Sequence, residues 1–352
     1  MLTRRQFALG TLALGTSLTF RHAPAAEAKK QPSGPPLVTP GSGIRIAKTG
    51  DDFEQLDWNY YPSSPKSSWN IDENMRVPGG ISKNNLWVEA GKRGQPDMIR
   101  RVITPPAGIP GSIGSMCIQT LQSGIPGRPS GQQQQDDLLH NTQGQVGRTI
   151  PVSWTPNCIC RVYMPPVSQW ENRVGPTFGY RVGLLGWGKK STNEEYWPGM
   201  FIHMERGTNK SGERTYGLRV YVRGDGYGRD LPGPVFEPEE WATLGMTCSP
   251  DGQVHFFARK GVDDLETGDC IGSYWPYSYR AHSFQTFFFN VINQDDGHSI
   301  STPWVIDDAM LYAASAPTSK IRGVPPAQSA EKPADKPAEK VAENPTAETE
   351  QK

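Results

Sequence analysis

The chain has 352 residues, of which 36% are hydrophobic and 20% charged, and this composition excludes a wholly disordered chain, a collagen and a protein with many membrane spans. Its 38 Gly and 32 Pro residues interrupt helices, so they argue against a helical bundle and favour strands joined by turns. Lys plus Arg and Asp plus Glu both number 36, so no net charge attracts the chain to nucleic acid or to an acidic membrane surface.

The N-terminal residues predict export. Arg4 and Arg5 form a twin-arginine pair followed by Phe7, and 8–20 is an apolar run too short to span a bilayer as a stable anchor. Small residues between 23 and 28 suit a signal peptidase. We therefore expect 1–28 to be a Tat-type signal peptide and the mature chain, without a membrane span, to be periplasmic or extracellular in a bacterium.

The C-terminal residues differ from the middle of the chain. From residue 315 onward the sequence is rich in Pro, Ala, Lys and Glu, with almost nothing apolar to bury, which predicts a disordered tail over 315–352. Residues 29–44 are expected to be a linker. The stretch between, 45–314, shows no internal repeat and no further shift in composition, so we expect one domain with long loops.

Alternation of apolar and polar residues predicts strands in this domain. The Pro- and Gly-rich stretch 104–131 and the Gln- and Asp-rich run 132–137 are first expected to form a long surface loop. Ser249-Pro250-Asp251-Gly252 then supplies turn residues for a hairpin. No long amphipathic helix is visible, so the sequence predicts an all-β antiparallel sandwich. In chain order the predicted strands are 161–164, 201–205, 216–223, 241–248, 253–258, 284–292 and 304–312.

Three short motifs carry a resemblance to a known group of proteins. They are Asp51-Asp52-Phe53-Glu54 before the first strand, the hairpin around Pro250-Asp251-Gly252, and the closing Trp304-Val305-Ile306-Asp307-Asp308. Together they resemble the concanavalin A-like lectin/glucanase superfamily over about residues 51–314. This resemblance implies a jelly roll of two antiparallel sheets, one of them concave, with polysaccharide as the usual ligand.

The enzymes of that superfamily match this chain only in part. Glycosidases of the laminarinase type carry Glu-x-Asp-x-x-Glu, and no Glu-x-Asp occurs in the sequence, which argues against a retaining glycosidase. Jelly rolls of the alginate-lyase type carry Gln-Ile-His, which Phe201-Ile202-His203 resembles with Phe in place of Gln. Their Arg-x-Glu-Leu-Arg and Tyr-x-Lys-x-Gly-x-Tyr motifs are not recognisable here, so a lyase activity depends on the individual residues.

Polar side chains alternate with the apolar ones on three predicted strands. If the apolar residues face the core, the polar ones point to the opposite face and could converge on a concave sheet. An imidazole or phenol there could take the proton next to a uronic carboxylate, while a guanidinium binds that carboxylate. Ordinary cross-strand pairs on a solvated face are the simpler interpretation. The catalytic candidates are His203, Glu205, Arg219 and Tyr221, and the further ligand-binding candidates on these strands are Arg161, Tyr163 and Arg223.

Aromatic residues recur at alternate positions near residue 277. An extended 273–280 segment would present Trp275, Tyr277 and Tyr279 on one side, where they could stack on sugar rings or pack into the core. Trp187 and Trp197 could add aromatic side chains at the rim of such a surface.

Acidic residues at the two ends of the domain suggest a metal site. A sandwich can bring its first and last strands together, and hard carboxylate oxygens suit calcium. Acidic strand ends also occur without metal, so a structural calcium ion is a hypothesis. Its ligands would be Asp52, Glu54, Asp307 and Asp308, next to Asp51.

Five cysteines, at 117, 158, 160, 248 and 270, permit at most two disulfides. Cys248 and Cys270 could bracket the hairpin as a disulfide, or the thiols could be reduced and buried.

These features together predict an exported jelly-roll protein that binds polysaccharide or a glycan of the cell envelope. Two alternatives stay open. The first is a polysaccharide lyase, or another glycan-cleaving enzyme, that uses His203, Tyr221 and Arg219. The second is a structural protein of the envelope.

Overall fold

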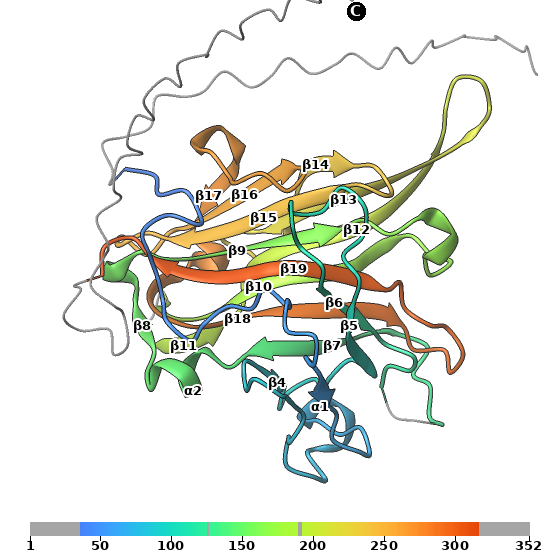
Figure 1. Ribbon diagram of the computed structural model, residues 1–352, viewed down its shortest axis with the longest axis horizontal. Coiled ribbons are helices and arrows are strands. Elements are labelled where there is room, and N and C mark those ends of the chain that lie inside the picture. The colour runs from blue at the N-terminus through green and yellow to red at the C-terminus, as the bar shows by residue number, and fades with distance from the viewer. Residues whose placement is uncertain (1–35, 125–126, 189–191, 317–352) are drawn as a thin grey trace, which may run out of the picture. The chain divides into compact units, whose positions relative to one another are not determined.

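The computed structural model describes residues 36–124, 127–188 and 192–316 (Figure 1). The predicted export signal and nearly all of the predicted tail lie outside these residues. The described chain folds into two antiparallel sheets that enclose one main hydrophobic core, which confirms the predicted all-β sandwich. Within the described part of the chain, no helix is long and apolar enough to cross a membrane.

The smaller sheet has eight described strands, and β1 (Ile44–Arg45) pairs with β19 beside the main path. In spatial order the other strands are β17 (Cys270–Tyr274), β16 (Val254–Lys260), β15 (Trp241–Cys248), β9 (Pro156–Tyr163), β19 (Trp304–Ala313), β6 (Ser115–Gln119) and β5 (Met98–Val102).

The larger sheet has eleven described strands, with β11 (Asn193–Tyr196) paired to β10 and β8 (Ile150–Pro151) paired to β18. In spatial order the other strands are β14 (Asp230–Phe236), β13 (Arg214–Arg223), β12 (Gly199–Thr208), β10 (Gly175–Trp187), β18 (Arg280–Gln294), β7 (Gln133–His140), β4 (Trp87–Glu89), β3 (Ile81–Ser82) and β2 (Tyr60–Tyr61). The described helical turns are α1 (Trp69–Asp72), α2 (Thr142–Val146), η1 (Val152–Trp154), η2 (Val167–Gln169), η3 (Thr267–Asp269) and η4 (Pro276–Ser278).

The core between the sheets is rich in aromatic rings. Phe289 of β18 is fully buried, and its ring stacks on Trp87, Phe178 and Tyr180 at centroid distances of 5.3, 5.9 and 5.4 Å. These three residues come from β4 and β10, so the rings join strands on both sides of β18. Burial of several large aromatic side chains supplies much of the hydrophobic stabilisation of such a sandwich.

The strands with clear alternation lie where the sequence predicts them. The predicted strands 201–205 and 216–223 fall within β12 and β13, which pair in register with Ile202 opposite Val220. β15 and β16 form the predicted hairpin, with Cys248 opposite Val254. Gly252 in its turn has a φ of 85°, a conformation that glycine adopts without strain.

The expectation of a long surface loop over 104–137 is wrong in two places, because Ser115–Gln119 is the buried strand β6 between β19 and β5, and because 132–137 does not form a loop. These residues enter β7, which pairs with β18, and its Asp136 and Asp137 side chains are buried. Asp136 accepts hydrogen bonds from Lys66 and Thr120, and Asp137 accepts one from Asn290. Distant partners therefore compensate for the burial of two carboxylates, and no local pattern in the sequence reveals those partners.

The N-terminal segment joins the sandwich before the predicted domain start. Leu37 packs against a small cluster on the smaller sheet, and the Gly41 N–H donates to the side chain of Asn157 at 2.8 Å. Asp51 forms a bridge with Ala309, so the first and last parts of the domain are neighbours as expected. All five thiols are free, and Cys248 is not bonded to Cys270.

Candidate functional site

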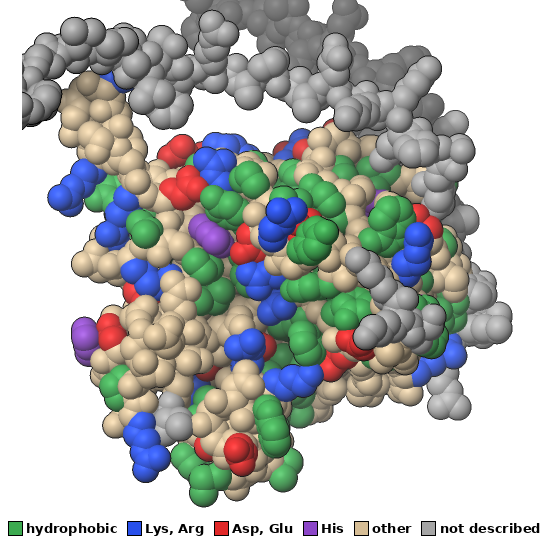
Figure 2. Space-filling model, turned by 180° about the vertical axis from the view of Figure 1, so that it is seen from behind, with side chains coloured by type: hydrophobic (Ala, Val, Ile, Leu, Met, Phe, Trp, Pro, Cys, Tyr) green, Lys and Arg blue, Asp and Glu red, His purple; other side chains and the backbone are tan. Residues whose placement is uncertain are grey.

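The outer face of the larger sheet carries a group of polar side chains between apolar ones. Ile202 and Met204 of β12 and Val220 of β13 point into the core. Period-2 geometry therefore directs the intervening residues of β10, β12 and β13 outward. Figure 2 views the molecule from behind and shows basic side chains gathered in the middle of this face, among hydrophobic ones. The outward set includes Arg181, Phe201, His203, Glu205, Arg219, Tyr221 and Arg223.

Four of the predicted residues form one cluster, which we call the His203 cluster: His203, Glu205, Arg219 and Tyr221. The rings of His203 and Tyr221 lie 4.2 Å apart between centroids, with an interplanar angle of 33°. Glu205 Oε1 accepts hydrogen bonds from Arg219 Nε at 2.8 Å and from the Tyr221 hydroxyl at 3.1 Å. The strand register brings the four side chains together, because Arg219 of β13 lies directly opposite His203 of β12.

The imidazole of His203 is neutral at neutral pH. Burial lowers its pKa below the usual value, against a smaller opposing effect of Asp230. Its Nε2 atom is buried and has no hydrogen-bond partner among the described residues. Burial, followed by the hydrogen bond to Glu205, raises the pKa of Tyr221. A neutral imidazole beside a protonated phenol is a suitable pair for proton transfer.

Arg181 forms the second feature of this face. Its side chain is only 7% exposed, and its guanidinium donates through Nε to the carbonyl of Trp197 at 3.0 Å. The guanidinium lies over the rings of Phe201 and Phe288, 5.2 and 5.4 Å from their centroids. Among the described residues no carboxylate forms an ion pair with it, but the Asp137 carboxylate in the same cavity lies near enough to oppose the fall in its pKa. Burial lowers the pKa of Arg181 to about 10, so the group remains charged at neutral pH although it is largely withdrawn from water.

A glycine makes room for this arginine. Gly199 of β12 lies directly opposite Arg181, and a Cβ atom at that position would lie 2.5 Å from Arg181 Cγ. The aliphatic part of Arg181 therefore lies flat across β12, which aligns the guanidinium with the sheet surface.

A cavity of about 410 Å³ opens beside Arg181, and we call it the Arg181 groove. At its rim Lys92 lies over the ring of Trp197 at 4.1 Å and pairs with Glu195 at 3.0 Å. Arg93 faces the side-chain amide of Gln135, whose oxygen lies 2.8 to 2.9 Å from its nitrogens. The described lining consists of Asn70, Ala90, Gly91, Lys92, Arg93, Asp137, Leu139, Arg181, Glu195, Trp197, Thr286 and Phe288.

Phe201 separates the Arg181 groove from the His203 cluster along β12. Arg223 lies opposite Gly199, in the same row across the strands as Arg181. Unlike Arg181, Arg223 is neutralised, because both its Nε and its Nη2 donate to the Asp230 carboxylate at 2.8 Å. Arg181 is therefore the arginine of this centre without a direct ion pair, whereas Arg219 and Arg223 are already paired with acids.

Two predicted ligand-binding residues lie elsewhere. Arg161 and Tyr163 belong to β9, which is a strand of the smaller sheet, so they do not share a face with the His203 cluster. Arg161 forms ion pairs with Asp308 and, at 2.6 Å, with Asp264. The expectation that three strands with outward polar residues belong to one sheet is wrong for β9, because alternation does not tell which sheet a strand joins.

The predicted row of aromatic rings does not form. The 273–280 segment is not extended, because Pro276–Ser278 is a helical turn in which Tyr277 has a φ of 56°. Trp275 instead lies under Arg280 at 4.8 Å, and the Tyr279 hydroxyl donates to Glu194 at 2.5 Å. Tyr277 lies near enough to Arg181 to affect its pKa, less than burial and Asp137 do, but it does not line the groove.

The acidic residues proposed for calcium do not converge. Asp307 accepts hydrogen bonds from Ser112 and Ser115, Asp308 pairs with Arg161, and Glu54 accepts backbone N–H groups of 113–114. Asp52 caps its own turn through the Glu54 N–H. In the described ranges no three His, Cys, Asp or Glu side chains are placed to hold a metal ion, so calcium stays a prediction from the sequence.

The sequence reasoning named Trp197 as a rim aromatic, and Trp197 lines the groove, but it missed Arg181 and the other charged residues there. A signal for Arg181 was present, since it is a lone charge in the apolar run Phe178-Gly179-Tyr180-Arg181-Val182-Gly183-Leu184-Leu185. A charge within such a run has to be paired or functional. Lys92, Arg93 and Asp137 have no comparable signal, because their sequence neighbours are polar.

Comparison with known proteins finds remote likeness only. No protein-family model matches the chain, and no curated protein matches it. Among solved structures, an alginate lyase from Pseudomonas aeruginosa is 9% identical, with 62% of this chain and 87% of that chain covered and a TM-score of 0.36. An exolytic alginate lyase from Zobellia galactanivorans is 12% identical, with 72% and 100% covered and a TM-score of 0.34.

A carbohydrate recognition domain, that of Emp47p, is 7% identical, with 77% of this chain and 97% of that chain covered and a TM-score of 0.34. Similarity at this level assigns no family and no activity to the chain. Membership of the concanavalin A-like superfamily stays a prediction from the sequence motifs.

Proposed function

We propose that this protein binds an acidic polysaccharide on the outer face of the larger sheet, with a sugar carboxylate held at Arg181. One observation carries the proposal. The Arg181 guanidinium is charged and largely buried, it has no ion pair within the described residues, and it borders a cavity. The carboxylate of Asp137 lines the same cavity and attracts Arg181, but it forms no ion pair with the guanidinium. A ligand carboxylate would supply the direct, hydrogen-bonded partner that this buried charge lacks.

The surroundings of Arg181 suit a sugar. Trp197 is half-buried in the lining and offers apolar ring surface to the C–H face of a pyranose ring where Lys92 does not cover it, whereas Phe288 is buried beneath Arg181. Arg93 adds positive charge at the rim, where it would meet a further acidic unit of a polymer, whereas Lys92 is paired with Glu195. The guanidinium of Arg181 can donate two parallel hydrogen bonds to a carboxylate, and such bonds are stronger than neutral ones.

A lyase activity is the second candidate, and the neutral His203 imidazole beside Tyr221 favours it, although substrate would have to displace the neighbours that bury its Nε2 atom. The neutral imidazole would accept the proton next to the uronic carboxylate, the bond to the leaving sugar oxygen would break, and a double bond would form in the ring. The leaving oxygen would receive a proton from Tyr221. Arg219 and Arg223 are committed to Glu205 and Asp230, so neutralisation of the substrate carboxylate at this point is weak, and binding is the better supported function.

The experiment is a binding and cleavage assay on the chain without residues 1–28. Uronate-containing and neutral polysaccharides are immobilised, and retention is compared for the wild type, Arg181→Gln and Arg100→Gln. Arg100 is an exposed arginine of the smaller sheet and serves as the matched control. Ultraviolet absorbance of unsaturated sugar ends is followed in parallel, with His203→Gln as the variant that would remove it.

We expect retention on uronate polymers that Arg181→Gln loses and Arg100→Gln keeps. Equal retention of both variants would refute the Arg181 site. Unsaturated products that depend on His203 would establish the lyase function instead. Failure to bind or cleave any polymer would leave a structural role in the envelope.

We further propose that the protein acts outside the cytoplasm. The twin-arginine sequence supports this proposal. Residues 1–28 fused to a reporter should direct export in a bacterium with a functional Tat pathway, and Arg4→Lys with Arg5→Lys should abolish that export.

A further inference from the structure

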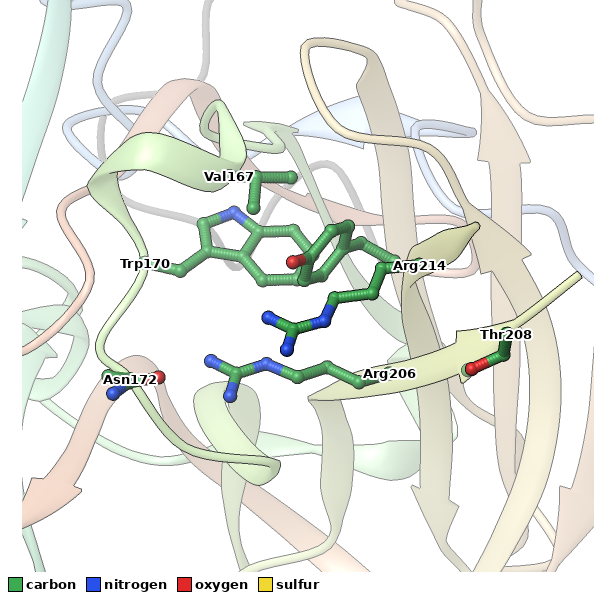
Figure 3. Close-up of a pocket in the computed structure, with 8 residues that line it drawn as sticks. Val167, Trp170, Asn172, Arg206, Thr208 and Arg214 are labelled. Atoms are coloured by element: carbon green, nitrogen blue, oxygen red, sulfur yellow. The ribbon is translucent and has the colours of Figure 1, made fainter. Parts of the chain in front are cut away.

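A second cavity lies at the far end of the β12–β13 hairpin, and we call it the hairpin pocket. Its volume is about 530 Å³, and Figure 3 shows its walls. The ends of β12 and β13 form one wall, and the segment after β9 forms the other. The lining consists of Val167, Trp170, Asn172, Arg206, Gly207, Thr208, Arg214 and Tyr216.

The strand register places this pocket on the opposite side of the sheet from Arg181. Met204 and Leu218 point into the core, so Arg206 and Tyr216, two positions further along their strands, point to that same side. Arg206 lies directly opposite Tyr216, and Arg214 lies opposite Thr208. The core-facing side of the hairpin therefore extends past the edge of the core. Beyond that edge, arginines occupy the positions that apolar side chains occupy within the core.

Arg206 and Arg214 are exposed, and neither has an ion pair or hydrogen bond with the described residues. Figure 3 shows the two guanidinium groups side by side, both directed into the pocket, with Asn172 beyond them. Two like charges at such positions repel each other, so an anion between them relieves an unfavourable interaction.

The nearby acids do not neutralise these arginines. Glu205 points to the opposite face and pairs with Arg219. Glu213 accepts hydrogen bonds from Asn209 and Ser211 in the hairpin turn, which lowers its pKa. On the facing segment, Glu171 is buried and pairs with Arg173 at 2.7 Å. Each acid of the hairpin and the facing segment thus has another partner, which leaves the pocket positively charged.

The floor of the pocket is rigid and aromatic. Trp170 is 9% exposed, and its Nε1–H donates to the carbonyl of Pro165 at 2.8 Å. Its ring meets that of Tyr216 edge to face, 5.8 Å between centroids. A fixed aromatic surface next to two free guanidiniums suits a ring that carries an anionic substituent more than it suits a bare anion.

We propose that the hairpin pocket is a second binding site, which holds one carboxylate or sulfate group carried on a sugar ring. The anionic group binds between Arg206 and Arg214, and the ring lies against Trp170 and Tyr216. This site shares the acidic class of ligand with the Arg181 groove, but it lies on another side of the sheet and does not depend on that groove.

The test uses the chain without residues 1–28, labelled with fluorotryptophan and observed by fluorine NMR. The chain has 10 tryptophans, and the Trp170→Phe variant identifies the resonance of the pocket. Methyl glucuronide, a monosulfated glucose, inorganic sulfate and neutral methyl glucoside are titrated separately. The first two probes distinguish a carboxylate from a sulfate ester.

We expect one of the two acidic sugars to shift the Trp170 resonance in a saturable way, while methyl glucoside does not. Arg206→Gln and Arg214→Gln should each weaken that affinity about tenfold, the loss typical of one charge-assisted hydrogen bond. Both substitutions are at exposed positions, so folding should be retained. Arg181→Gln should leave the shift unchanged, which separates this site from the proposed function.

Three results would overturn the proposal. They are no shift with either acidic sugar, an unchanged affinity in the double arginine variant, and an equal response to neutral methyl glucoside. A response to inorganic sulfate as strong as that to the acidic sugars would refute the sugar site and leave a simple anion site.

Discussion

The substitution Arg181→Met tests whether this guanidinium lacks a counter-ion in the free protein. Burial lowers the pKa of Arg181 from 12.5 to about 10. Each pKa unit corresponds to about 1.4 kcal/mol, so the charge is destabilised by roughly 3 kcal/mol relative to the unfolded chain. Below pH 10 both states are protonated, and this penalty is fully present at pH 7.

Methionine is close to arginine in length and can lie over Gly199 between Phe201 and Phe288. The variant removes the penalty of the buried charge, but it loses hydrogen bonding to the Trp197 carbonyl and the attraction to the buried Asp137 carboxylate, together a loss of about 1 to 2 kcal/mol. We therefore expect Arg181→Met to be as stable as the wild type or more stable, by up to about 2 kcal/mol. Urea unfolding at pH 7 measures the difference, provided that both proteins show the same m-value.

Arg219→Met is the matched control, because Arg219 lies on the same face but has the Glu205 carboxylate as a partner. This control should show no gain in stability. A loss of more than about 2 kcal/mol in Arg181→Met would refute the reasoning, since the guanidinium would then be satisfied within the folded protein. The folded protein would then already satisfy Arg181, and the proposal that Arg181 binds an anionic ligand would lose its physical basis.

Three further predictions concern stability at low pH, an ion pair and ligand binding. Burial lowers the pKa of His140 to about 3, so the unfolded state binds the proton first as the pH falls below 6.5. Relative to His140→Gln, the wild type should therefore lose about 2.7 kcal/mol of unfolding free energy between pH 7 and pH 4.5, as measured by urea unfolding at both values. Arg161→Met should lower the unfolding free energy by about 3 kcal/mol, because it leaves the carboxylate of Asp308 without its partner. The same variant should leave polysaccharide retention unchanged, and weakened retention would place Arg161 in the binding site. Gly199→Ala should displace Arg181 together with the β10 backbone, because the added Cβ would also lie 2.6 Å from the Tyr180 carbonyl oxygen, and it should weaken retention on uronate polymers about tenfold. Affinity electrophoresis that shows no change in a variant whose urea unfolding is intact would contradict the positioning role of this glycine.

Strand positions and the two faces of each strand could be predicted from the sequence. Alternation in β12 and β13 places Ile202 and Val220 in the core, and it therefore also places His203, Arg219 and Tyr221 together on the other side. These residues lie on the two strands of one hairpin, so their contact depends only on the pairing of two strands that follow each other in the chain. For that reason the residues of the His203 cluster could be predicted from the sequence.

Only the tertiary structure decided which strands share a sheet and which polar groups find partners. Arg161 alternates in the same way as Arg219, yet β9 joins the smaller sheet, where Asp308 neutralises it. Arg181 has a counterpart in Arg223, but Arg223 forms an ion pair with Asp230, whereas Arg181 interacts with the buried carboxylate of Asp137 without forming an ion pair. Charge pairing and burial depend on contacts between residues far apart in the chain, and a local sequence pattern does not reveal these contacts.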